Sequence, residues 1–205
     1  MSVKDDIAKA KKLGELNSKI SALNTQIKET TDDFVQKQSL LTKKIDDEIK
    51  MLFKDRLSHP EIKVEIKGDE ITGRGVNLSY SLKISDEARI ISRVLDGNEE
   101  KYKFRYVFSS HIPNQPGWTP RGTETEEELK NLQIASLEKY LELCNKARDK
   151  LVSEGIQIES FKMDRGELTF TSMSKKELES EDEKKYSKTN IQRLLRLIGL
   201  EEVTP

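Results

Sequence analysis

Few residues in this sequence have the chemical type and spacing that catalysis or metal binding requires. His59 and His111 are the only histidines, and neither stands in a metal-binding spacing such as HExxH. Ser109 and Ser110 precede His111, but a catalytic triad is defined by spatial geometry and not by adjacency along a strand end. We therefore expect no catalytic residue, no metal and no cofactor, and a protein that is not an enzyme.

A glycine pair around Arg74 is the nearest approach to a nucleotide-binding motif. Gly73 and Gly75 lie within a strand region, whereas a phosphate-binding loop connects a strand to a helix. A bulge or a wide turn is the expected local structure.

The segment from His111 to Gly122 is the first candidate for partner binding. It contains three of the five prolines and the only tryptophan, which predicts a stiff loop. Trp118 and Arg121 are residue types that are enriched in binding hot spots. The alternative is structural, because a tryptophan in a long loop can fold back and close the end of a sheet.

Basic and aromatic residues alternate farther upstream, as they do in some surfaces that bind single-stranded nucleic acid. Lys101, Lys103 and Arg105 are the basic members, and Tyr102 and Phe104 lie between them. Alternate residues of a strand point to opposite faces, so we expect the aromatic rings in the core and the basic groups in water. Nucleic-acid binding is therefore possible but not favoured.

The sharpest pattern in the sequence is an apolar seam near the N-terminus, within a helix expected over residues 3–57. The seam has the spacing of a coiled coil, and its members are Leu13, Leu16, Ile20, Leu23, Ile27 and Phe34. After a four-residue slip it resumes more weakly as Gln38, Leu41, Ile45 and Leu52. Pro60 prevents the helix from continuing.

Such a helix would be about 80 Å long, too long to bury its seam against the remaining chain. It therefore needs a helical partner, and we expect an intermolecular coiled coil in a homo-oligomer, by default a dimer. Two alternatives remain. Thr30 to Asp33 could cap a second helix and give an internal hairpin, or the helix could pack on its own domain.

From Glu61 onward the apolar period changes to two, which predicts antiparallel strands over 62–66, 76–84, 89–95 and 102–108. Thr125 and Glu128 form a capping-box pattern that opens a helix to about Ser153. We expect this helix to cover the sheet with the stripe Leu129, Leu132, Ser136, Tyr140, Leu143, Ala147 and Leu151. A second hairpin is expected over 156–173.

The C-terminal part is expected to be a charged linker followed by a short apolar helix over 191–200. Leu194, Leu195 and Ile198 belong to its apolar surface, which is too large to stay exposed. The helix should dock on its own domain or on the sister chain, or bind a different protein as a helix in a groove.

Together these elements predict an α+β protein with three parts: a coiled-coil stalk over 1–58, a head over 59–173 in which a long helix covers a β-meander, and a linker with an apolar helix over 174–205. This layout resembles that of RWD-type subunits of kinetochore complexes, although the second hairpin and the terminal helix depart from it. The 36 basic and 37 acidic residues argue against a surface tuned throughout to nucleic acid or membranes. Cys144 is the only cysteine, which excludes an internal disulfide and favours a cytoplasmic protein. We expect a non-enzymatic adaptor whose head binds an unidentified protein, without membrane association.

Overall fold

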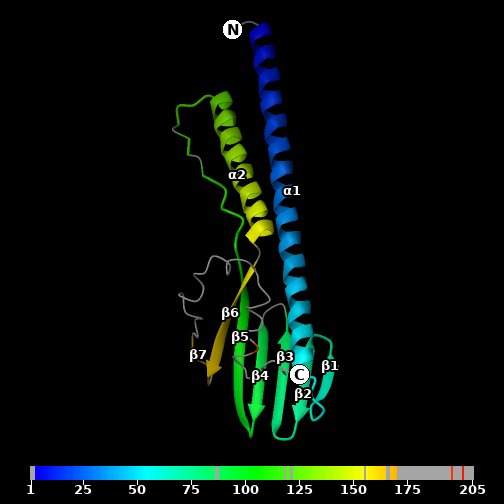
Figure 1. Ribbon diagram of the computed structural model, residues 1–205. Helices are drawn as coiled ribbons and strands as arrows, with labels where there is room; N and C mark the ends of the chain where they lie inside the picture. The colour runs from blue at the N-terminus through cyan, green and yellow to red at the C-terminus, as the bar shows by residue number, and fades with distance from the viewer. Residues whose placement is uncertain are drawn as a thin grey trace. The chain divides into compact units, whose positions relative to one another are not determined.

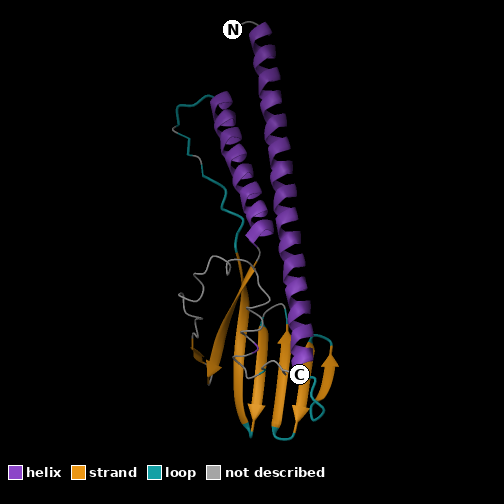
Figure 2. Cartoon of the chain, viewed as in Figure 1, coloured by secondary structure: helices purple, strands orange, loops and turns teal. Residues whose placement is uncertain are grey.

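The computed structural model describes residues 3–85, 88–117, 119–120, 122–154, 156–164, 167–169, 195 and 200. It is an α+β protein with a long N-terminal helix, an antiparallel sheet and a later helix (Figure 2). Contacts divide the chain into two units. The first unit contains the chain up to Gln38 together with Ser110–Ser153, and the second contains Ser39–Ser109 with the described residues from Glu154 onward.

Helix α1 spans Val3–Arg56 without interruption. The expected single helix is therefore confirmed, and the alternative of a helical hairpin at Thr30 is wrong. The helix ends four residues before Pro60, because proline disfavours the helical conformation in the residue before it. Its first part belongs to the first unit and its last part to the second.

In the first unit, α1 packs along α2, which spans Glu126–Glu154. Leu23 of α1 is buried against Ile134 and Leu137 of α2, and four half-buried apolar residues pack around them: Leu16, Ile20, Ile27 and Leu141. Three ion pairs link the helices in the same order along both chains, so the helices run parallel: Lys12 with Glu127, Lys19 with Glu138, and Asp33 with Arg148. The N-terminal seam thus has a helical partner within its own chain.

The start of α2 follows the capping-box prediction. Thr125 donates hydrogen bonds from its backbone N and its Oγ1 to Glu128 Oε2, at 2.7 and 2.9 Å, and Glu128 N donates to Thr125 Oγ1 at 3.3 Å. These hydrogen bonds satisfy donors that a helix start leaves without partners. They also lower the pKa of the Glu128 carboxyl, the backbone hydrogen bond being the largest cause.

The predicted buried face of α2 is wrong in part. Ala147 and Leu151 are buried as expected, but Leu132 is 42% exposed and the buried apolar positions include Ile134, Leu137 and Cys144. The helix packs on α1 within the first unit, so a different stripe is buried. On another side of α2, Ser136 Oγ donates a hydrogen bond at 2.9 Å to the carbonyl of Pro116, which belongs to the segment before the helix.

The second unit contains one antiparallel sheet whose strands are neighbours in chain order (Figure 1). Its strands are β1 (Lys63–Lys67), β2 (Glu70–Gly75), β3 (Leu78–Ile84), β4 (Arg89–Leu95), β5 (Asn98–Phe108), β6 (Ile156–Asp164) and β7 (Glu167–Thr169). Asp96 and Gly97 both adopt positive φ angles, as a two-residue type I′ hairpin turn requires, and Asn77 has a positive φ in the turn before β3.

Strand β2 is the element that the sequence pattern missed. Gly73 pairs regularly with Val64 of β1 and Tyr80 of β3, and Gly75 pairs with Leu78 of β3, so neither a bulge nor a wide turn forms there. A Cβ atom on Gly73 would lie 2.9 Å from both Cδ atoms of Leu57 and 3.0 Å from Ile62. A side chain at this position would therefore have to displace Leu57, which directly follows α1 and packs on the strand.

The core of the second unit lies between the sheet and the last four turns of α1 (Figure 1). Ile45, Ile49, Phe53 and Leu57 are 0–2% exposed, and they pack in one cluster with inward side chains of the sheet such as Leu82. The expected cover of the sheet by α2 is therefore wrong: α1 performs that role. Leu195 and Leu200 are buried in the same cluster.

Candidate binding surface

The two faces of the sheet differ sharply in burial. Inward side chains of β2 to β5, such as Ile71, Leu82, Ile91 and Phe104, are at most 4% exposed. The opposite face, which we call the open face, consists of the alternate residues of β1 to β5 that point away from α1. None of these side chains is buried. The open face is therefore accessible over five strands.

Basic residues are in excess on the open face. Across β1 to β5 it carries seven basic and three acidic side chains: Lys63, Lys67, Arg74, Lys83, Lys101, Lys103 and Arg105, with Glu65, Glu70 and Glu99. A net charge of +4 on this face contrasts with −1 for the whole chain. The face should attract acidic molecules at long range.

Part of this charge is already neutralised. Glu65 lies 3.6 Å from Lys63 and 3.8 Å from Lys67, and Glu99 lies 3.0 Å from Lys101. In the described part of the chain, Arg74, Lys83 and Lys103 form no ion pair with a carboxylate. We call these three residues, which no carboxylate of the described part of the chain neutralises, the unpaired cations of the open face.

Small hydroxyl side chains form the middle of the open face. Thr72, Ser81 and Ser92 are in register on three adjacent strands, and Ser79 lies on the same face as Ser81. All four are half-buried. We call these four residues the hydroxyl floor. Long basic side chains surround it, and because its own side chains are short, a partner can approach the sheet closely there.

On the inward face, a polar cluster joins α1 to the sheet. Arg89 donates to Asp46 from Nε at 2.7 Å and from Nη2 at 2.9 Å, and the Tyr106 hydroxyl donates to Asp46 Oδ1. The Arg89 guanidinium lies 4.3 Å from the centroid of the Tyr106 ring. Both carboxylate oxygens have partners, so the cluster holds the helix on the sheet.

This geometry changes the pKa values of Tyr106 and Arg89. Burial disfavours the Tyr106 phenolate, and the neighbouring Asp46 carboxylate adds to the effect, so the pKa of Tyr106 is raised far above its usual value. Burial is the largest single effect and opposes the charge on Arg89, but the hydrogen bond to Asp46 and the electrostatic interactions with Tyr106 and Asp46 together outweigh it and raise the pKa of the guanidinium. Tyr106 thus stays protonated in the folded protein well into the alkaline range.

Alkaline pH should therefore reduce the stabilising effect of Tyr106. A raised pKa in the folded state means that the contribution is complete below the usual tyrosine pKa of about 10 and is lost as pH rises beyond it. We expect wild type to exceed Tyr106→Phe in unfolding free energy by about 1 kcal/mol at pH 8, and this difference to shrink at pH 11. Urea unfolding at both pH values measures it, and an unchanged difference would contradict the assigned hydrogen bond.

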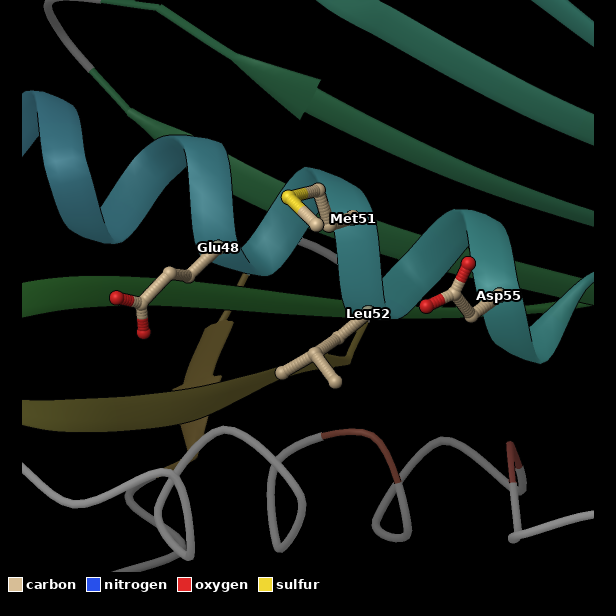
Figure 3. Close-up of a pocket in the computed structure, with 4 residues that line it drawn as sticks. All are labelled: Glu48, Met51, Leu52 and Asp55. Atoms are coloured by element: carbon tan, nitrogen blue, oxygen red, sulfur yellow. The ribbon is translucent and has the colours of Figure 1, made fainter.

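A pocket lies along the last part of α1. Among the described residues it is lined by Glu48, Met51, Leu52 and Asp55, which come from successive turns of the helix (Figure 3). These residues offer it two carboxylates and apolar atoms.

No family model, no curated protein and no solved structure matches the chain.

The structure places the predicted site residues in different environments. Tyr102 and Phe104 are buried, while Lys101 and Arg105 are exposed and Lys103 is half-exposed. Burial of the rings confirms the predicted division between the two faces, and it removes those aromatic rings as a surface on which bases could stack.

Several other predicted sites lie partly or wholly beyond the described residues. Trp118, Arg121, Leu194 and Ile198 are outside them, whereas Leu195 is buried in the core of the second unit. Of the six seam residues, Leu23 and Phe34 are buried, and Leu13, Leu16, Ile20 and Ile27 are half-exposed.

Sites that would indicate metal binding or membrane insertion are absent from what the structure describes. In those residues no group of three or more histidine, cysteine or acidic side chains converges. His59 Nδ1 accepts a hydrogen bond from the backbone N of Glu61 at 3.2 Å, beside the end of α1. None of the described helices is both long enough and apolar enough to cross a membrane.

Proposed function

We propose that this protein is a non-enzymatic adaptor that binds another protein through the open face of its sheet. The main support is the contrast between the two faces of the sheet. The inward face is covered by α1, whereas the open face has no buried side chain over five strands. Antiparallel sheets commonly expose one face to water, so exposure alone is weak support. The unpaired cations around a hydroxyl floor are what distinguish this face from an ordinary solvated surface.

Self-association is a second part of the proposal. Leu16, Ile20 and Ile27 pack on α2 yet remain half-exposed, and a second copy would bury the rest of their surface in a homodimeric coiled-coil assembly. Light scattering should then give the mass of two chains at micromolar concentration. A monomeric mass would remove self-association and leave the open face as the interaction site.

Nucleic-acid binding is the alternative, and the basic excess that includes Lys101, Lys103 and Arg105 is the observation in its favour. With Tyr102 and Phe104 in the core, these residues would contact phosphates and not bases. The three carboxylates on the same face oppose such binding.

A bulky substitution at the centre of the open face tests the main proposal. Ser81 lies between Thr72 and Ser92 and is half-exposed, so a tryptophan there should cover the floor without disturbing the core. Ser21→Trp, on an exposed position of α1, is the matched control. Both variants should unfold at the same denaturant concentration as wild type.

Affinity purification from the source cell then compares the three proteins. We expect proteins that co-purify with wild type and with Ser21→Trp to be lost from Ser81→Trp. Retention of the same proteins by Ser81→Trp would show that the open face is not the binding surface.

A further inference from the structure

The three unpaired cations of the open face have a defined arrangement. Lys83 on β3 and Lys103 on β5 are both paired with Ile90 of the intervening strand, so they lie in the same row across the sheet. Two strand spacings separate them by about 10 Å. Arg74 lies on β2, opposite Ser79 and four residues along β3 from Lys83.

This separation matches a repeat of the α-helix. Residues seven apart on one face of a helix are about 10.5 Å apart, so two carboxylates at that spacing can approach Lys83 and Lys103 together. Ile90 lies between the two lysines, and in the neighbouring row Ser81 and Ser92 are short enough to admit a helix close to the sheet. The geometry points to an acidic helix of a partner protein as the occupant of the open face.

The composition of the face favours a protein over a nucleic acid. Ile90, Val94 and Val107 add half-exposed apolar surface that phosphates and sugars do not use, whereas the apolar side of a helix does. Glu65, Glu70 and Glu99 would repel a continuous row of phosphates, but a helix can place basic or neutral residues opposite them.

This inference rests on the proposed function and narrows it to one chemistry. It requires that binding depend on Lys83 and Lys103 and not only on access to Ser81. A charge reversal at the two lysines therefore separates the two proposals.

Fluorescence anisotropy with a labelled alanine-rich helical peptide tests the inference directly. The peptide carries glutamates seven residues apart, and a scrambled peptide of the same composition and a duplex DNA serve as comparison probes. We expect Lys83→Glu/Lys103→Glu to weaken binding of the first peptide about tenfold, as the loss and reversal of two ion pairs implies. Lys9→Glu/Lys11→Glu on α1 makes the same charge change on exposed positions and should leave affinity nearly unchanged.

Two results would overturn the inference. One is equal affinity of wild type for the ordered and the scrambled peptide, or tighter binding of the duplex DNA than of either peptide. The other is loss of the cellular partner from Ser81→Trp with full retention by Lys83→Glu/Lys103→Glu, which would leave the open face as the binding site but remove the acidic helix as its ligand.

Discussion

Phe53→Ala should lower the free energy of unfolding by about 3–5 kcal/mol, because it removes a large side chain from the centre of a packed core. Phe53 is 0% exposed and lies in the cluster that α1 forms with the sheet. Met51, two residues away on the same helix, is 66% exposed, so Met51→Ala should change stability by less than about 0.5 kcal/mol. Urea unfolding followed by circular dichroism measures both.

This pair of variants tests whether the end of α1 belongs to the sheet or to a separable stalk. Equal and small effects at the two positions would contradict the packing described. So would cooperative, native-like unfolding of a chain that lacks residues 1–57, because that chain lacks the buried core residues Ile45, Ile49 and Phe53 of α1 and Leu57 directly after it.

Asp46→Ala should be destabilising by about 3–5 kcal/mol, since it leaves the Arg89 guanidinium buried without its carboxylate. The two side chains are only 12% and 14% exposed and join α1 to β4. Replacing both partners by apolar residues, as in Asp46→Leu/Arg89→Met, should restore much of the loss because no charge then remains uncompensated.

Equilibrium unfolding of the single and double variants measures the coupling. Glu142→Ala, which breaks the exposed pair with Lys146 on α2, should leave the unfolding midpoint nearly unchanged. A double variant less stable than Asp46→Ala would show that the cluster does more than satisfy a buried charge.

Local sequence patterns predicted an element well where its apolar period or its motif was clear. The helix at the N-terminus, the strand Arg89–Leu95 and the capping box at Thr125 all appear as expected. Strand β2 was missed because glycine disfavours strands in isolation. Its place depends on Leu57, a contact that no local pattern reveals.

The predictions of which element each helix packs against failed for a different reason. We expected the helical partner of the seam in a second chain, whereas α2 of the same chain packs on it. The α2 sequence contains two overlapping apolar stripes, and only the structure shows that the one with Ile134 and Leu137 meets α1. Downstream, the buried residues Ile45, Ile49, Phe53 and Leu57 recur every four positions. With this spacing, each buried side chain is rotated by about 40° around the helix axis relative to the one before it. A broad sheet surface can bury such a rotating row, whereas a narrow helix–helix seam cannot.

The candidate surface was predictable only in part. Alternation placed Lys101, Lys103 and Arg105 on the water side of their strand, as found. Arg74, Lys83 and the hydroxyl floor come from three other strands, and their neighbourhood depends on the pairing register. Asp46 was not recognisable either, because its partners Arg89 and Tyr106 are 43 and 60 residues away in the sequence.

Mapping the bound partner on the chain by NMR tests the central claim most directly. The partner recovered with wild type is titrated into isotope-labelled protein while the backbone amide signals are recorded. We expect shifts at the open face, led by Thr72, Ser81 and Ser92, and unchanged signals at exposed positions of α2 such as Lys139. Shifts confined to α1 and α2, with none on β2 to β4, would contradict the assignment of the open face as the binding surface.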